Sequence, residues 1–392
     1  MTDRMTEPMA DPTADPFADP FADLYIGLMS GTSMDGVDGV LADFSGIDRG
    51  FVKVLAHAHQ IFPPDLATEF LALNTSGSDE LHRATLASNE LARVCASVMR
   101  CLLESSGVSA DQVRAVGAHG QTVRHRPGEF DAVGYTVQLN NAALLAELAG
   151  IDVVADFRSR DVAAGGQGAP LVPAFHRAVF GKSGQASAVL NIGGISNLTL
   201  LQADGSTIGF DCGPGNVLMD HWCQVHTGNA FDDAGRWAES GVILEPLLAA
   251  LLNEPYFNTA PPKSTGRDRF HPAWLAQRLD ASDARAQDVQ ATLVELTATV
   301  CADALLRNDA AARELLVCGG GAFNRHLMRR LAARLPSVQV MQTDERGLPA
   351  SQVEACAFAW LARAFVRREP GNLSAVTGAN GPRVLGALYP AH

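Results

Sequence analysis

The sequence predicts an α/β fold made of two similar halves. Its 392 residues are enough for two domains of ordinary size. Apolar runs with strand periodicity alternate with runs of helical periodicity along the whole chain, which is typical of α/β proteins. A unit of strand, glycine-rich turn and strand occurs at residues 24–44 and again at 187–201. Such units are common singly, but their repetition suggests an internally duplicated architecture.

Composition narrows the class of protein. Apolar residues make up 47% of the chain and charged residues 19%, which excludes a wholly disordered protein. The net charge of −13 argues against nucleic acid as a partner but leaves room for a local anion pocket. No apolar stretch approaches the ~18 residues of a membrane span, and no signal-peptide pattern is visible, so we expect a cytoplasmic protein without a membrane partner. The seven cysteines lack a CxxC spacing, which predicts reduced, mostly buried thiols.

The first half of the chain contains the elements of one α/β domain. Residues 8–23 repeat a short Asp-Pro-x-Ala unit, and because proline blocks helices and sheet ladders, we predict a disordered acidic tail over residues 1–23. Periodicity then predicts strands over 24–29, 37–44, 113–118 and 152–156, and helices over 81–104 and 142–148. We place the first domain at residues 24–155.

The second half repeats this alternation. Residues 187–201 predict a hairpin with a glycine-rich turn, and apolar residues at three- and four-residue steps predict a core-facing helix over 287–306. A strand over 314–318, a glycine turn and helices over 324–335 and 353–365 follow. We place the second domain at residues 156–369.

The turn Ser30–Asp38 is the segment most informative about chemistry. Its glycines and hydroxyls allow successive backbone N–H groups to approach an anion. Asp35 and Asp38 would repel a bare phosphate, so a nucleotide site here requires a divalent cation such as Mg²⁺. The alternative is a tight hairpin in which aspartate serves as a turn former. The segment lacks the GxxxxGK[ST] pattern of a P-loop.

Two further loops offer candidate chemistry. The turn Gly319–Gly321 lies between a strand and a helix, where backbone N–H groups and the helix dipole favour a nucleotide; a tightly packed bulge is the alternative. Asp211 follows a short strand and precedes Gly-Pro-Gly. Its carboxylate is a candidate general base, although a single aspartate more often serves as a turn or cap residue.

Arginine and histidine residues suggest a binding site for a small anionic ligand. Arg158 and Arg160 alternate with carboxylates ahead of a flexible segment around Gln167, and an arginine fork suits a carboxylate or phosphate. A surface ion-pair cluster is the alternative. His119 ends a predicted strand and is a candidate substrate contact, since its spacing from His125 does not match a zinc-binding helix. Residues 263–267 favour a solvated turn over a phosphate contact.

Together these segments resemble one family, the 1,6-anhydro-N-acetylmuramic acid kinases. The matching motifs lie, in order, at residues 27–38, 117–122, 156–158, 165–173, 191–194, 211–216, 263–267 and 318–321. The resemblance covers about residues 24–390. It implies the fold of actin, Hsp70 and hexokinase, an ATPase fold with a nucleotide cleft between two domains, in which residues 370–392 return to the first domain. It also implies a homodimer.

The resemblance further implies a reaction and its residues. The family converts ATP, water and 1,6-anhydro-N-acetylmuramic acid into N-acetylmuramic acid 6-phosphate and ADP during recycling of the bacterial cell wall. Asp211 would be the catalytic base acting on water. The ATP contacts, with Asp35 near Mg²⁺, would be Gly31, Thr32, Ser33, Met34, Asp35, Gly36, Val37, Asp38, Gly319, Gly320 and Gly321. The sugar contacts would be His119, Arg158, Gln167 and Glu354.

Two other classes of protein fit the same residues. An ordinary sugar or acetate kinase would use Asp211 on a free hydroxyl and incorporate no oxygen from water. An ATP-operated scaffold or chaperone would need no small-molecule site, which the polar residues between Arg158 and Pro170 argue against. ATP turnover that responds to an anhydro-sugar and not to unfolded peptide separates the scaffold from the kinases.

Overall fold

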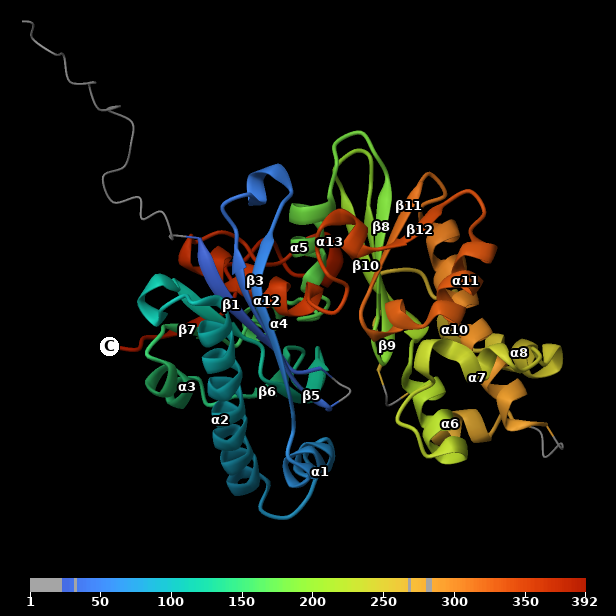
Figure 1. Cartoon of the computed structure of the whole chain (residues 1–392), viewed down its shortest axis with the longest axis horizontal. Coiled ribbons are helices and arrows are strands. Elements are labelled where there is room, and N and C mark those ends of the chain that lie inside the picture. Colours follow the sequence, from blue (N-terminus) through green and yellow to red (C-terminus); the bar gives the residue numbers. More distant parts are fainter. Residues whose placement is uncertain (1–22, 32–33, 267–268, 280–283) are drawn as a thin grey trace, which may run out of the picture.

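The computed structural model describes residues 23–31, 34–266, 269–279 and 284–392 (Figure 1). Of the predicted acidic tail, residues 1–22 lie outside this part of the chain. Asp23 is described, and its carboxylate Oδ1 lies 2.6 Å from Arg367 Nη2 and 3.7 Å from Arg363 Nε. The start of the described chain is therefore held by a helix near the C-terminus.

The first half of the molecule is built on a six-stranded mixed sheet. Its strands are β1 (Leu24–Met29), β2 (Gly36–Asp43), β3 (Lys53–Ile61), β4 (Ala115–Ala118), β7 (Val153–Ala155) and β13 (Ala387–Tyr389). Their order across the sheet is β13-β7-β4-β1-β2-β3. β1, β2 and β3 pair antiparallel, whereas β4 and β7 continue from β1 in parallel. The C-terminal strand β13 closes the other edge antiparallel to β7.

The second half is built on a five-stranded sheet with the same topology. Its strands are β8 (Ser187–Ile192), β9 (Ile195–Leu201), β10 (Thr207–Pro214), β11 (Glu314–Cys318) and β12 (Gln339–Gln342), in the order β10-β9-β8-β11-β12. Again three antiparallel strands are followed by two parallel ones. The predicted α/β class and the predicted duplication are confirmed by this repeated strand order.

Helices cover both faces of each sheet (Figure 1). Those of the first half are α1 (Pro64–Leu73), α2 (Glu80–Ser106), α3 (Ala142–Ala149) and α4 (Ser159–Ala163), with a separate hairpin of β5 (Gln121–Pro127) and β6 (Gly134–Leu139). Those of the second half are α5 (Val172–Phe180), α6 (Val217–Thr227), α7 (Arg236–Glu239), α8 (Glu245–Leu252), α9 (Pro272–Ala276), α10 (Ala286–Asn308), α11 (Arg325–Arg334), α12 (Val353–Val366) and α13 (Ser374–Thr377).

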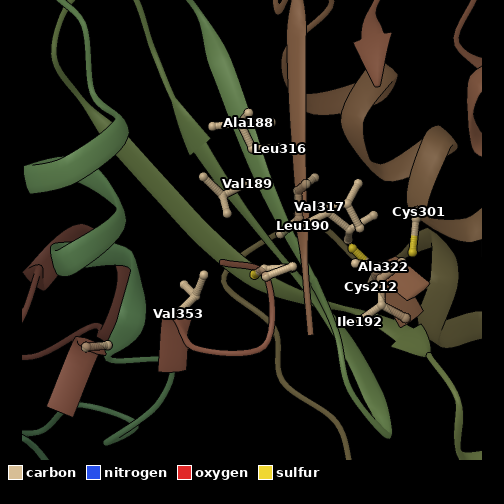
Figure 2. Packing of buried hydrophobic residues seen from close by; sticks show 14 of the residues in the cluster. Ala188, Val189, Leu190, Ile192, Cys212, Cys301, Leu316, Val317, Ala322 and Val353 are labelled. Atoms are coloured by element: carbon tan, nitrogen blue, oxygen red, sulfur yellow. The ribbon is translucent and has the colours of Figure 1, made fainter. Parts of the chain in front are cut away.

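Helix α12 lies between the two sheets. It approaches the first sheet so closely that a Cβ at Gly27 of β1 would lie 1.9 Å from the carbonyl oxygen of Ala355. On its other side it meets α5, where the rings of Phe175 and Trp360 are 6.3 Å apart. Figure 2 shows Val353 at the start of α12 and Cys301 of α10 on opposite sides of the second sheet. The predicted domain boundaries at 155 and 369 stay a prediction.

Helix α10 differs from its predicted form. The expected apolar face is buried, but so are most of its polar residues, and Glu295 accepts hydrogen bonds from Arg330 and Arg334 of α11. By length and composition α10 is the one helix of the described residues that could cross a membrane; 89% of its most apolar window is buried inside the protein, as in a core helix. All seven cysteines are free and six are buried, which confirms the predicted thiols.

Candidate active site

Four of the predicted site residues converge between the two sheets. Asp211 lies on β10, Arg158 lies directly before α4, His119 directly follows β4, and Glu354 is in the first turn of α12. Arg158 donates hydrogen bonds to His119, and its positive charge acts on both Asp211 and Glu354. These residues come from both halves of the molecule, so only the folded chain assembles them.

The loop after residue 262 holds Asp211 in place. The backbone N–H of Thr265 donates to Asp211 Oδ2 at 2.9 Å, and the N–H of Asp211 donates to the carbonyl of Lys263 at 3.2 Å. The hydroxyl of Tyr256 donates to the carbonyl of Asp211 at 2.8 Å. The segment 263–267 is expected to be a solvated turn. In its described part, Lys263 and Thr265 instead hold the candidate base by hydrogen bonds. Tyr256 carries no sequence signal for this role.

Burial changes the basicity of Asp211. It raises the pKa of the carboxyl group from 3.8 to about 6, against the opposing effects of the Thr265 N–H, Arg158 and Lys263. A carboxylate with this pKa is ionised at neutral pH yet is a stronger base than an exposed aspartate. Those two properties suit a general base.

The raised pKa predicts a pH dependence of the reaction. A base acts only when it is ionised, so kcat/KM should fall about tenfold per pH unit below pH 6 and level off above it. An ordinary aspartate with a pKa near 3.8 would move this break about two units lower. Initial rates between pH 4.5 and 8 in buffers of constant ionic strength measure the break. A flat profile down to pH 4.5 would contradict the assignment of Asp211.

Arg158 is oriented by two acceptors. Its Nε and Nη2 lie 3.1 and 2.9 Å from His119 Nε2, and its Nη1 donates to the carbonyl of Gly168 at 2.8 Å. Burial lowers the pKa of Arg158 to about 10, and the carboxylates of Glu354, Asp161 and Asp211 oppose this shift. The guanidinium therefore stays cationic at neutral pH.

His119 is a neutral hydrogen-bond acceptor. Burial, and then the charge of Arg158, lower its pKa well below 6.5. Because arginine only donates, Nε2 of the ring carries no proton and Nδ1 does. Nε2 of His119 is thus engaged by Arg158, and Nδ1 of His125 lies 2.9 Å from Thr136 Oγ1.

The other two predicted sugar contacts differ in their surroundings. Glu354 is half-buried, and burial raises its pKa, opposed by Arg158 and by a hydrogen bond with Asn191 and reinforced by Asp38. Gln167 is exposed in the turn after α4, and its backbone N–H donates to the carbonyl of Thr377 at 2.7 Å. Glu354 thus joins the cluster directly, whereas Gln167 lies in the loop beside it.

The predicted nucleotide loop packs against the end of β4. The carbonyl of Gly31 accepts from Gln121 Nε2 at 3.2 Å and from the N–H of Met34 at 3.3 Å. The hydroxyl of Ser30 donates to the carbonyl of Gly120 at 3.0 Å. Thr32 and Ser33, two of the predicted ATP contacts, lie outside the described residues. Gly31 and Met34 lie beside the strand end that carries His119.

Residues 36–38 of this segment belong to strand β2, and Asp35 directly precedes the strand. A Cβ at Gly36 would lie 2.3 Å from the carbonyl oxygen of Gln60, so the close approach of β3 already requires this glycine. Val37 is buried in the core between the sheet and α2, so only its backbone is available to a ligand. Asp38 Oδ1 lies 3.2 Å from His57 Nε2 and 3.1 Å from His59 Nδ1. ATP contacts by these residues stay a prediction.

The glycine turn after β11 is shaped by its neighbours. The segment Gly320–Phe323 forms a 3₁₀ turn, and α11 begins only after it, at Arg325. Gly319 has a φ of +79°, and a Cβ there would lie 2.3 Å from Asn191 Oδ1. A Cβ at Gly321 would lie 2.3 Å from Ile192 Cγ2, whereas Gly320 is exposed and meets its nearest neighbour at 3.5 Å. Of the three glycines, Gly320 leaves the most open space.

The chain is similar in sequence to known proteins along almost its whole length. The chain is 63% identical over 372 residues to the anhydro-N-acetylmuramic acid kinase of Variovorax paradoxus (strain S110), with 93% of this chain and 98% of that protein covered. It is 59% identical to the enzyme of the same name from Cupriavidus pinatubonensis, with the same coverage. Among solved structures, an activator of 2-hydroxyisocaproyl-CoA dehydratase from Clostridium difficile with bound ADPNP matches with a TM-score of 0.45 and 12% identity, covering 88% of this chain and 96% of that one. The family model for anhydro-N-acetylmuramic acid kinase matches residues 23–391, and the chain belongs to this family.

Proposed function

We propose that the protein converts 1,6-anhydro-N-acetylmuramic acid, ATP and water into N-acetylmuramic acid 6-phosphate and ADP during recycling of the cell wall. Family membership confirms the expected enzyme class, a phosphotransferase, and the expected kind of substrate, an anhydro-sugar. The observation that carries the mechanism is Asp211, a half-buried carboxylate with a pKa of about 6 within electrostatic reach of Arg158.

The reaction requires a base because the anhydro bridge leaves no free hydroxyl at carbon 6. Asp211 removes a proton from water, and the water oxygen forms a bond to C1 of the sugar. The C1–O6 bond breaks, its electron pair stays on O6, and O6 forms a bond to the γ-phosphorus of ATP as ADP leaves. The water activation resembles inverting glycoside hydrolysis, with the phosphoryl group in the place of the acid at the leaving oxygen.

Arg158 and Glu354 are suited to hold the sugar. The fork of Arg158 fits an anionic group, which the substrate offers in its lactyl carboxylate. Glu354 is an acceptor for sugar hydroxyl or amide N–H groups. His119, neutral and hydrogen-bonded to Arg158, fixes the plane of the guanidinium. In these roles Arg158 would face the lactyl carboxylate of the sugar, and Glu354 would face its hydroxyl or amide groups.

The proposed reaction also requires sites for ATP and Mg²⁺. The loop from Gly31 to Asp38 and the exposed Gly320 would hold the nucleotide, and Mg²⁺, near Asp35, would neutralise charge on the phosphates. Among the described residues no group of three or more His, Cys, Asp or Glu side chains could hold a metal ion. A cation bound mainly through water, phosphates and one or two carboxylates fits that donor set.

Labelled water tests the hydrolytic step. In ¹⁸O-water the product should carry one label at the C1 hydroxyl at the earliest time points, because the attacking oxygen comes from solvent. The control is unlabelled N-acetylmuramic acid 6-phosphate incubated under the same conditions, which measures anomeric exchange. Label no faster than in this control would sink the hydrolytic mechanism and favour a kinase that acts on a free hydroxyl.

We also propose a cytoplasmic homodimer. Resemblance to the family supports both statements, and the free cysteines are compatible with a reducing compartment. Light scattering of the purified protein measures the oligomeric state. A mass of 41.4 kDa at all concentrations would contradict the dimer.

A further inference from the structure

A second buried carboxylate, Asp161 of α4, has no part in the reaction as proposed. Its side chain is fully buried. Oδ2 accepts a hydrogen bond from the backbone N–H of Gly168 at 2.7 Å. Oδ1 accepts from Asn372 Nδ2 at 2.6 Å and from Thr377 Oγ1 at 2.8 Å. Burying a charge is costly, and here three neutral donors compensate for it, which marks Asp161 as the centre of a built polar cluster.

Gly168 joins the cluster to Arg158 of the active site by hydrogen bonds. The N–H of Gly168 binds Asp161, while the carbonyl of Gly168 accepts from Arg158 Nη1 at 2.8 Å. Gly168 has a φ of +66°, and a Cβ at Gly166 would lie 2.2 Å from Asp161 Oδ2. The two glycines are therefore required by the approach of this turn to Asp161 and need no ligand to explain them.

The other side of the cluster is the segment that returns from the second half to the first. Asn372 lies just before α13 and Thr377 is the last residue of α13. Val376 of the same helix packs against Gly209 of β10, the strand of Asp211. The carbonyl of Thr377 also accepts from the N–H of Gln167. Asp161 thus ties the turn that orients Arg158 to the segment that packs on the strand of the base.

We propose that Asp161 is a positioning residue: by fixing the Gly168 peptide and the returning segment, it holds the guanidinium of Arg158 in one orientation between His119 and the sugar. The inference rests on the proposed function in taking Arg158 to bind the substrate. It adds that the affinity for the sugar depends on a carboxylate that does not itself touch the sugar.

The variant Asp161→Asn tests this role. One amide oxygen can still accept from Asn372 and Thr377, but the amide NH₂ then faces the N–H of Gly168, and two donors cannot pair. We expect KM for the anhydro-sugar to rise about 10- to 100-fold, the range of one hydrogen bond to a charged group, while KM for ATP stays within about twofold. Asp288→Asn is the matched control, because Asp288 is also a buried carboxylate that accepts from a backbone N–H, that of Val242, but is not connected to Arg158. It should leave both KM values unchanged.

A milder pair of variants covers the case in which Asp161→Asn does not fold. Thr377→Val removes one donor to Asp161 and should raise KM for the sugar in the same direction, whereas Thr377→Ser keeps the hydroxyl and should restore the wild-type value. Equal KM values in Thr377→Val and Thr377→Ser would overturn the proposal.

A double-mutant cycle separates positioning from general stability. If Asp161 acts through Arg158, adding Asp161→Asn to Arg158→Ala should cost less than twofold further in kcat/KM for the sugar. Full additivity would overturn the proposal. Failure of the proposed function is a different result, since the wild-type protein itself would then not turn over the anhydro-sugar.

Discussion

Replacing Asp211 with asparagine should lower kcat by about 10²- to 10⁴-fold, the range lost with a general base. The substitution keeps the size of the side chain and an oxygen that can accept from the N–H of Thr265, so the loop at 263–265 should stay in place. What disappears is the ability to take a proton from water. Release of ADP in the presence of the anhydro-sugar measures the loss, with product identified as sugar 6-phosphate.

Stability separates this loss from misfolding. Burial raises the pKa of Asp211 above its unfolded value, so above about pH 6 the ionised carboxylate works against the folded state. Asp211→Asn should therefore unfold at the same temperature as the wild-type protein or higher at pH 7.5, and should still bind the sugar. Formation of sugar 6-phosphate within threefold of the wild-type rate would show that another group is the base.

The largest loss of stability is expected from Gly27→Ala. The added Cβ would lie 1.9 Å from the carbonyl oxygen of Ala355 and 2.6 Å from the backbone nitrogen of Ala359. Both are main-chain atoms of α12, so the helix itself must move away from β1. Overpacking a core costs about 1–3 kcal/mol when side chains can adjust, and backbone contacts this short place the cost at ~3 kcal/mol or more. Chemical denaturation, or loss of soluble expression, measures it.

Activity should fall with stability in Gly27→Ala, because α12 also carries Glu354. Gly77→Ala is the control: its nearest neighbour is Arg83 Nη1 at 3.3 Å, the end of a long, half-buried side chain and not a main-chain atom. That variant should lie within about 0.5 kcal/mol of the wild-type protein. Equal stability of the Gly27 and Gly77 variants would show that α12 has room to shift.

Most predicted elements have their counterparts in the structure because local patterns decided them. The strand over 24–29 and the helix over 81–104 match β1 and α2 to within two residues. Strand β3, helix α1 and the β5–β6 hairpin were not predicted. β3 is an edge strand with largely exposed or half-buried side chains, so it lacks the apolar run that marks a central strand. A strand whose side chains are mostly exposed or half-buried shows only a weak apolar pattern in the sequence.

Several predicted site residues turned out to serve packing as well. The sequence predicts nucleotide contacts at Gly36, Gly319 and Gly321. The close approach of a neighbouring strand already requires each of these glycines. Glycine in a sequence signals close approach of the backbone, but not what approaches it. The polar residues of the 263–265 loop are likewise typical of a solvated turn. The sequence does not show that this loop hydrogen-bonds with Asp211.

The sequence by itself determined the α/β class, the duplicated order of elements and, through eight ordered motifs, the family. These follow from periodicity and from residue identity at short spacing, which are local properties of the chain. Only the tertiary structure decided which groups act on one another. Thr265 binds Asp211 across 54 residues, and Thr377 binds Asp161 across 216. Burial, pKa and the orientation of a guanidinium depend on distances in space, and no local pattern contains those distances.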